Sequence, residues 1–435
     1  MSFAVYIAIL AGLVLGFIYY FLKKKGDPRY TLLYFFFMFP LIDYKVIAVD
    51  YGNYKMFDIL AFMILVFGWR EFFRKLNVLR IDFILIVLLF AALIIGALSS
   101  EHPTRSLLYV GGVLPPFIFL RFLILEVRKD PGFIKDIFRI FKYICVIAVV
   151  FTIIQTFVGS ENFNLYGQLN INVLGGDIIR YPGIFYDAQA NGLFFALISF
   201  LWLYNFKEFG RVGFSQLFLI GFTLFGLFLS GSRSPVLGIA GALLFLLLFS
   251  KGKMRSNLVV FFLIVGVSLF FFLQFVEIDP GRFQSLDEAY EFRNEIWQGA
   301  LEIFREHPLL GIGVGNYQSY IMKYDISQSL LLPDNEVLYL GQPENGYLAI
   351  LTEWGGIASF FLFLLILSPI IRTIRDFFYG RNVGPSVLSS AALICFLIAF
   401  MSVYSLSDRR IMIVITLYIS LTILFAEKSI VPDEN

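Results

Sequence analysis

The chain has 435 residues, of which 59% are hydrophobic and 15% are charged, and its formal net charge at neutral pH is +2. Soluble chains are on average about 45–50% apolar, so this composition excludes an ordinary soluble protein and indicates a polytopic membrane protein. Apolar runs recur from Ser2 to Ala426, and we therefore expect residues 1–435 to form a single transmembrane domain. The balanced charge does not suggest nucleic acid as a partner.

Thirteen apolar segments follow one another along the chain, most of them close to the length of about 20 residues that crosses a bilayer as a helix. They predict an all-α, polytopic transmembrane bundle of about 12–13 helices. Charges interrupt the second segment and the third is short, so either could be re-entrant or tilted. The predicted spans are 2–22, 30–49, 56–69, 81–99, 106–125, 143–158, 190–206, 214–230, 235–250, 257–275, 346–371, 386–406 and 411–426.

The basic residues indicate how this bundle is oriented. Alternate connections contain 23 of the 34 Lys and Arg residues, and connections rich in Lys and Arg face the cytoplasm. This pattern predicts an N-terminus outside the cell and a C-terminus inside. The remaining basic residues then face outward, against the general trend, and are candidates for a functional role.

Two of the predicted outer connections are long. Residues 159–189 are rich in Asn and Gly, which favour turns. Residues 276–344, between the tenth and eleventh spans, form a large extracytoplasmic loop of 69 residues with 12 acidic and 4 basic side chains. An arginine in this loop therefore lies in acidic surroundings.

Arg293 lies in such a position, on an amphipathic helix predicted by the period of its apolar residues. The apolar stripe consists of Leu286, Ala289, Tyr290, Ile296, Trp297, Ala300, Leu301 and Phe304. Arg293 falls on the same face, which directs it toward the membrane surface or the domain core. An arginine that snorkels at the interface is the plain alternative. We expect the helix to end at His307, because a proline follows.

The motif "GIGVGNY", Gly311 to Tyr317, is superficially similar to a phosphate-binding loop. It lacks the Gly-Lys-Ser/Thr ending and a preceding strand, so a nucleotide site is not expected. A tight glycine turn that leads back to the bilayer is the better interpretation.

Arg233 and Glu344 complete the set of candidates on the outer side. Arg233 separates two apolar runs in "FLSGSRSPVLGI", and Glu344 opens the eleventh span in "GQPENGYLAIL". Separately, they are explained by an interfacial anchor and by an acidic residue in the first turn of a helix. Together with Arg293, they could bind a diphosphate bidentately while the carboxylate acts as a general base on a hydroxyl. This combination suggests chemistry on a lipid-linked phosphate that requires no metal, and no D-x-D motif lies near the outer face.

Four segments in this order resemble the O-antigen ligase and polymerase superfamily, integral membrane glycosyltransferases of the WaaL and Wzy type. They are "RYPGIFYDAQANGLFFAL", "SGSRSPVLGI", "EFRNEIWQGALEIFREHPLLGIGVGNY" and "ENGYLAILTEWGGIASFFLFL". The resemblance covers about residues 177–367, and the first 150 residues match only as a set of spans. It implies a membrane glycosyltransferase fold of the GT-C type.

The resemblance also implies a reaction and its site residues. The expected reaction is metal-independent, inverting transfer of a glycan from undecaprenyl diphosphate to an acceptor hydroxyl, at the outer face of the bacterial plasma membrane. The implied partners are this lipid-linked donor and its acceptor, the lipid bilayer, a flippase and a chain-length regulator. Arg233, Arg293 and Arg180 match the arginines expected to bind the diphosphate, and Glu344 occupies the position of the catalytic base. Supporting roles are expected for Ser232, Asn345 and Tyr347.

The sequence departs from the family pattern at Glu344, since ligases carry a histidine before the asparagine. This departure favours a polymerase that extends a repeat-unit glycan over a ligase that acts on lipid A core, and both remain open. A transporter of an anionic substrate is the alternative from another class. Transporters usually show inverted repeats and charges near mid-bilayer, and we find neither pattern convincingly here.

Overall fold

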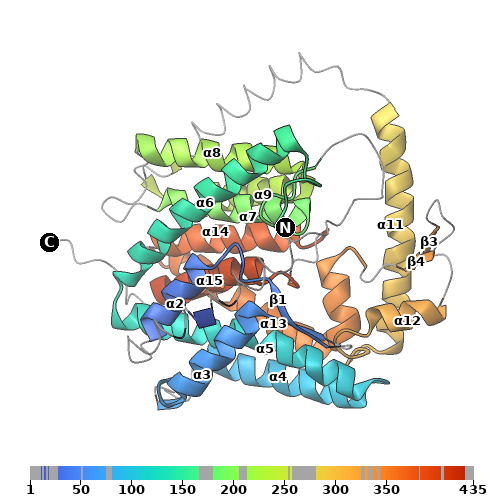
Figure 1. Cartoon of the computed structure of the whole chain (residues 1–435). Helices are drawn as coiled ribbons and strands as arrows, with labels where there is room; N and C mark the ends of the chain where they lie inside the picture. Colours follow the sequence, from blue (N-terminus) through green and yellow to red (C-terminus); the bar gives the residue numbers. More distant parts are fainter. Residues whose placement is uncertain are drawn as a thin grey trace.

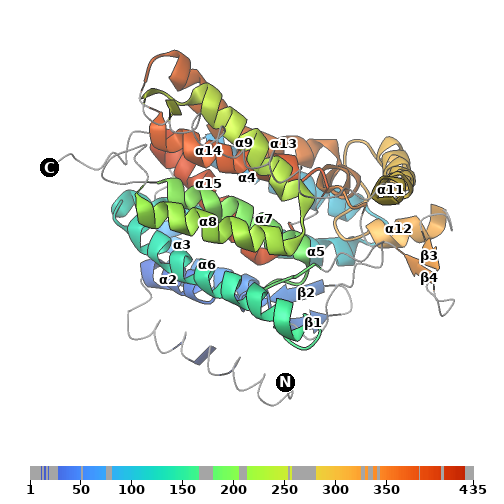
Figure 2. The ribbon, with the colours of Figure 1, turned by 90° about the horizontal axis from the view of Figure 1, so that it is seen from above.

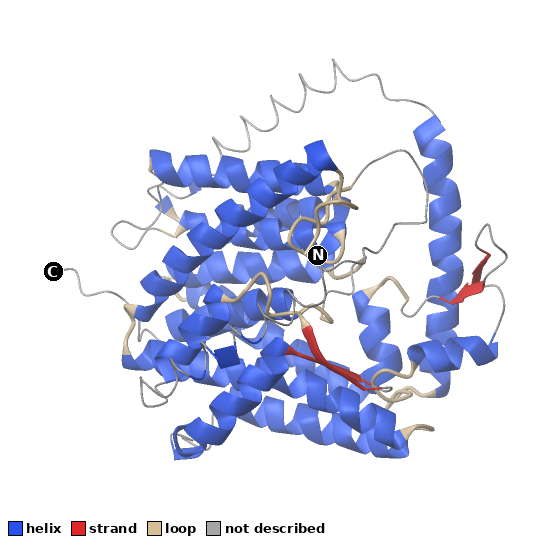
Figure 3. Ribbon diagram, viewed as in Figure 1, coloured by secondary structure: helices blue, strands red, loops and turns tan. Residues whose placement is uncertain are grey.

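The computed structural model describes residues 28–49, 52–74, 81–165, 180–204, 213–252, 255–256, 281–324, 329–331, 337–339, 343–381, 383–402 and 406–426, with isolated positions 11, 14, 15 and 18. Helices dominate these residues, and the strands form two short hairpins (Figure 3). The all-α polytopic prediction is therefore confirmed. The predicted spans 2–22, apart from the isolated positions, and 257–275 lie outside the described residues.

Most predicted spans coincide with helices. The agreement is closest at α4 and α8, whose bounds equal the predicted 81–99 and 214–230. The helices are α2 (Pro28–Phe37), α3 (Met56–Arg74), α4 (Ile81–Ser99), α5 (Pro103–Lys129), α6 (Phe133–Val158), α7 (Ala188–Ser199) with the 3-10 turn η1 (Phe200–Leu203), α8 (Phe214–Ser230), α9 (Arg233–Phe249), α11 (Gly281–Glu306), α12 (Tyr317–Tyr324), α13 (Gly346–Phe378), α14 (Gly384–Ala399) and α15 (Arg409–Ala426). The strands are β1 (Lys45–Val49), β2 (Gly52–Lys55), β3 (Ser329–Leu331) and β4 (Val337–Tyr339).

Three of the described helices, α5, α6 and α13, are long and apolar enough to cross a membrane on their own. Five further apolar helices are shorter, within α4, α7 with η1, α8, α9 and α14. These helices pack against one another in a bundle, and most of them run in the same general direction (Figure 1). The fold is that of a polytopic membrane protein.

The second predicted span, 30–49, differs from the structure. Helix α2 ends at Phe37, and the chain then turns into the antiparallel hairpin β1–β2. Asp43 precedes β1 and is 4% exposed, and its carboxylate pairs with Lys55 Nζ at 2.7 Å. A charge at this depth needs a partner, and the hairpin brings Lys55 back to provide it.

The two ends of the bundle differ in their contacts. At one end, the first three basic connections contact one another through Arg29 with Asp130 and Asp136, and through Lys129 with Glu71. Lys251 after α9 likewise lies 4.6 Å from the centre of the Phe377 ring of α13. In the part of the chain that the structure describes, these contacts join five of the segments that we predict to face the cytoplasm, three in one group and two in another.

Helix α11 lies across the other end of the bundle, nearly at right angles to the membrane helices, in both views (Figures 1 and 2). It packs against α13. Its start at Gly281 and its end at Glu306, directly before His307, confirm the amphipathic helix and its predicted stop. An orientation across the bundle end is what a helix at the membrane surface requires.

Candidate functional site

Four charged residues that are distant in sequence meet at the end of the bundle that α11 covers. Arg293 Nη2 on α11 lies 3.7 Å from Glu344 Oε2, which directly precedes the N-cap of α13. Burial, and then the positive charges of Arg233 and Arg293, lower the pKa of Arg180, whereas Glu344 raises it. Arg180 is thus close enough to interact electrostatically with all three of the other charged groups. The cluster holds three guanidiniums and one carboxylate, which leaves two positive charges uncompensated.

Arg233 is placed by the tight turn between α8 and α9. Gly231 ends α8 in the left-handed conformation, with φ of 63°, and a Cβ at this position would lie 3.1 Å from Arg180 Cγ. The glycine therefore permits both the turn and the close approach of Arg180. Ser232, the N-cap residue of α9, is buried, and its hydroxyl donates to the carbonyl of Ala188 at 2.7 Å. This bond joins the Arg233 turn to the start of α7.

Arg293 lies on the inward face of α11, as its spacing predicts. Ile296, Ala300 and Ile303 on that face are all at most 1% exposed. Of the predicted stripe, the side chains of Leu286, Ala289 and Tyr290 lie outside the described residues. Leu301 was predicted wrongly, because it is exposed and Ile303 is buried instead. Arg293 lies on nearly the same face as Ala300, and its contact with Glu344 directs it toward the start of α13.

Glu344 does not lie in the first turn of α13, so this part of the prediction was wrong. Asn345 is the N-cap residue, and its Oδ1 accepts hydrogen bonds from the amides of Tyr347 and Leu348 at 3.0 and 3.2 Å. Glu344 precedes it with a φ of 48°, the one positive value among the described residues other than glycine. Such a backbone costs about 1–3 kcal/mol and requires support from its surroundings.

That support comes from α14. The amide of Gly346 donates to the carbonyl of Phe400 at 2.9 Å, and the Tyr347 hydroxyl donates to the carbonyl of Leu397 at 2.7 Å. The Tyr347 ring also packs against the Phe400 ring. Asn345 and Tyr347 therefore hold in place the backbone that directly follows Glu344.

A feature that the sequence did not predict joins α11 to α13. Helix α13 is broken at Gly355, where φ is 73°. The segment 308–313, which follows α11, enters this break. Two of its amides, those of Ile312 and Gly313, donate to α13 carbonyls at 2.9 and 3.0 Å, and the acceptors are Thr352 and Glu353.

The same segment also accepts hydrogen bonds from α13 beyond the break. The amide of Gly356 donates to the carbonyl of Pro308 at 2.8 Å, and the amide of Ile357 donates to that of Leu309 at 3.2 Å. Backbone groups freed by the break are thus satisfied within the protein, as the membrane demands.

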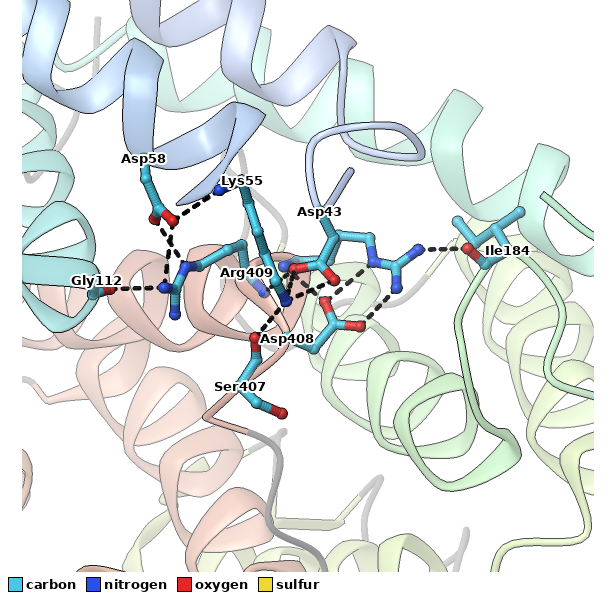
Figure 4. Close-up of polar contacts among 9 residues, drawn as sticks. Asp43, Lys55, Asp58, Gly112, Ile184, Ser407, Asp408 and Arg409 are labelled. Atoms are coloured by element: carbon cyan, nitrogen blue, oxygen red, sulfur yellow. Dashed lines mark hydrogen bonds and ion pairs between the residues drawn. The ribbon is translucent and has the colours of Figure 1, made fainter. Parts of the chain in front are cut away.

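A buried ionic cluster lies at the same end of the bundle and was also not predicted (Figure 4). Lys55 pairs with Asp43, Arg409 Nε with Asp58 at 2.8 Å, and Arg410 Nη2 with Asp408 at 2.6 Å. Burial alone would raise the pKa of Asp408, but the Arg410 guanidinium beside it lowers that pKa below its usual value. The signal in the sequence was the clustering of "LIDYK" and "SDRR" between apolar runs.

The cluster also completes the hydrogen bonds of α5. Pro116 has no amide to donate to the carbonyl of Gly112, four residues earlier. Arg409 Nη2 donates to that carbonyl instead, at 2.6 Å. The ionic cluster therefore fastens α3, α5 and α15 together beside the arginine site.

Comparison with known proteins adds an independent finding. Residues 217–364 match the family described as O-antigen ligase. An O-antigen ligase of Pseudomonas aeruginosa is 28% identical over 216 residues, which are 49% of this chain and 47% of that protein. The match thus spans about half the length of each protein. Both findings confirm the resemblance to the O-antigen ligase and polymerase superfamily, and the family match contains Arg233, Arg293 and Glu344.

Proposed function

From this match to the O-antigen ligase family, we propose that the chain is a glycosyltransferase that polymerises repeat units carried on undecaprenyl diphosphate. The reaction takes place at the extracytoplasmic face of a bacterial plasma membrane. The observation that supports it is the gathering of Arg180, Arg233 and Arg293 around Glu344 at one end of the bundle. No feature of a purely structural membrane bundle calls for three guanidiniums so close together.

The arginines bind the diphosphate of the donor. Guanidinium groups bind phosphate oxygens bidentately, through hydrogen bonds assisted by charge. Burial is the main cause that lowers the pKa of Arg180, and the positive charges of Arg233 and Arg293 lower it further. The three guanidiniums therefore repel one another. An anionic diphosphate between them relieves this repulsion and supplies the two negative charges that the cluster lacks. Arg233 is exposed, so the cluster is open to a ligand from outside.

Glu344 acts as the general base. The acceptor hydroxyl oxygen attacks the anomeric carbon, and its proton moves to the Glu344 carboxylate. The bond between the anomeric carbon and the diphosphate oxygen breaks, and its electron pair stays on the diphosphate, where the arginines stabilise the charge that develops. Attack from the face opposite the leaving group inverts the anomeric configuration.

The contact between Arg293 and Glu344 fits this role. At 3.7 Å it is too long for a hydrogen bond, and both side chains are partly exposed. Arg293 can therefore turn to the diphosphate when the donor binds, which leaves the carboxylate ready to accept a proton.

A ligase is the second candidate, because the relative from Pseudomonas aeruginosa is named as an O-antigen ligase. The glutamate at position 344, where ligases of the family carry histidine, favours the polymerase. The two activities differ in the acceptor, which is another lipid-linked repeat unit for a polymerase and lipid A core for a ligase.

The experiment uses the purified full chain in lipid nanodiscs with a defined undecaprenyl diphosphate-linked repeat unit, with and without a lipid A core acceptor. A ladder of longer lipid-linked glycans without lipid A core supports the polymerase. Transfer to lipid A core alone supports the ligase. If neither product forms, and the same protein reconstituted in liposomes moves the substrate across the membrane, the glycosyltransferase is contradicted and a transporter is supported.

A further inference from the structure

The segment 180–188 carries Arg180 to the site, yet it contains no strand and no helix before Ala188, and its position depends on contacts with its neighbours. One internal bond, from the amide of Phe185 to the carbonyl of Pro182 at 3.0 Å, closes a turn. A single turn does not fix where a segment lies relative to the bundle. Something outside the segment must hold Arg180 against Arg233 and Arg293.

Gln155 of α6 holds the segment by both backbone groups of one residue. Its Oε1 accepts from the amide of Gly183 at 2.8 Å, and its Nε2 donates to the carbonyl of Gly183 at 3.2 Å. The same Nε2 donates to the carbonyl of Phe163 at 2.8 Å. Gln155 is 0% exposed, so these bonds form away from water and are costly to leave unmade.

Gly183 packs tightly against side chains of α6 and α7. Its φ is +59°, and a Cβ would lie 2.6 Å from Thr152 Oγ1 and 2.7 Å from Asn191 Nδ2. No side chain fits there without displacing these groups. The backbone of Gly183 therefore contacts α6 directly, three residues from Arg180.

The rest of the segment is held by other side chains. Asn191 Nδ2 donates to the carbonyl of Tyr181 at 3.0 Å, Arg410 donates to the carbonyl of Ile184, and Ser232 donates to that of Ala188. Each of these takes one backbone carbonyl. Gln155 instead forms hydrogen bonds with both the amide and the carbonyl of Gly183, and so restrains the orientation of Gly183 as well as its position.

We propose that Gln155 is a positioning residue for the donor: by holding Gly183, it sets where Arg180 meets the diphosphate. This inference rests on the proposed function, because it requires Arg180 to bind the donor. Gln155 itself does not contact the donor.

The chain offers a matched control in Gln216 of α8. Its Nε2 donates to the carbonyls of Trp202 and Tyr204, both at 3.0 Å, and its Oε1 accepts from the amide of Gly213 at 2.8 Å. Gln155 and Gln216 thus make the same three kinds of bond to backbone. Gln216 makes them at the opposite end of α8 from Arg233, away from Arg180.

The test is a double-mutant cycle on binding of undecaprenyl diphosphate to the full chain in nanodiscs. Methionine matches glutamine in length and removes the hydrogen bonds. We expect Arg180→Ala and Gln155→Met each to raise the Kd by about tenfold. Gln216→Met should stay within about twofold of wild type, as should Arg180→Ala/Gln155→Met relative to Arg180→Ala alone. Melting temperatures of both glutamine variants are measured beside the Kd.

Three results separate the claims. An Arg180→Ala variant that binds like wild type contradicts the proposed role of Arg180 in the diphosphate site. If Arg180→Ala weakens binding and Gln155→Met does not, or if the two losses multiply in the double variant, the positioning role of Gln155 is wrong. If Gln155→Met cannot be purified, Gln155→Glu enters the same cycle, because it keeps the shape and an acceptor for the amide of Gly183 while losing donated bonds.

Discussion

Arg293 and Glu344 form a long ion pair at the candidate site. The two groups face each other at 3.7 Å, without a hydrogen bond, on the partly exposed end of the bundle. Surface ion pairs of this kind contribute about 0–1 kcal/mol to stability. Stability therefore does not explain why Glu344 occupies a strained backbone conformation, and this strain supports the proposed role toward a substrate.

The arginines can be tested by truncation. We expect Arg233→Ala and Arg293→Ala each to lower the transfer rate by about 100-fold or more, because each removes a group that stabilises the leaving diphosphate. Melting temperature and yield should stay close to wild type, since neither side chain is deeply buried. Arg305→Ala is the matched control, because Arg305 is an exposed arginine on the same helix α11. Rates of Arg233→Ala and Arg293→Ala equal to that of Arg305→Ala would remove both residues from the site.

Glu344 can be tested by changing its ability to accept a proton. Glu344→Gln should lower kcat by about 10²–10⁴-fold, the range that general base catalysis contributes, and should leave the KM for the donor within about twofold of wild type. Glu344→His should recover part of the activity, because imidazole also accepts protons near neutral pH. Full activity in Glu344→Gln would instead mean that Glu344 only shapes the start of α13.

At the level of elements, apolar length and period predicted most helices. Helices α4 and α8 could be predicted to the residue because they are uninterrupted apolar runs with polar ends. The span predicted at 30–49 failed because the burial of Asp43 depends on Lys55, a contact that no local pattern contains. The break of α13 was missed for a similar reason, since the groups that satisfy it come from the segment after α11.

The candidate site follows the same division. Arg233, Arg293 and Glu344 were predicted from their charge and their expected side of the membrane, and Arg180 only from the family resemblance; the structure brings the four together. The residues that hold them could not be found in this way. Gln155 lies in an apolar run and Gly183 in a turn-prone one, and neither sequence indicates a contact between them. Their hydrogen bonds appear only in the structure, where α6 and the segment 180–188 meet.

The break of α13 can be tested with three glycine variants. Gly355 has a φ of 73°, and a Cβ there would overlap the amide of Gly311 and the carbonyl of Leu309. We expect Gly355→Ala to destabilise the protein by about 2–5 kcal/mol and to abolish transfer, because the joint between α11 and α13 sets Arg293 against Glu344. Melting temperature and transfer rate are measured together.

Two controls separate strain from packing. Gly380 has a similar φ of 72° with open space around it, so Gly380→Ala should cost only about 1–2 kcal/mol. Gly221 lies within α8 with open space and an ordinary φ, so Gly221→Ala should be neutral or slightly stabilising. A Gly355→Ala variant no less stable than Gly380→Ala would mean that the docked segment does not hold the break.

At the scale of the whole molecule, the two ends of the bundle have different chemistry. One end gathers the basic connections, and the other gathers α11, the arginine cluster and the buried ionic cluster. From the distribution of Lys and Arg, we predict that the first end faces the cytoplasm. The proposed reaction then uses a donor that has already crossed the membrane.

This orientation can be measured by cysteine labelling. The native Cys145 and Cys395 are buried, so we expect them not to react with a water-soluble reagent in the folded protein. In intact cells with an accessible outer face, a membrane-impermeant maleimide should label Glu302→Cys on α11. Lys135→Cys, at the start of α6, should react only after the membrane is opened. Both positions are exposed in the structure. The reverse labelling pattern would place the arginine cluster in the cytoplasm and exclude the proposed donor.

The central claim is that the arginine cluster releases a diphosphate as a glycosidic bond forms, and the most direct measurement counts both products. In nanodiscs with the lipid-linked repeat unit, wild type should release one undecaprenyl diphosphate for each new linkage, and Arg293→Ala should lose both products together, by about 100-fold or more. Release of undecaprenyl diphosphate without new linkages, or an unchanged yield in Arg293→Ala, would contradict the account.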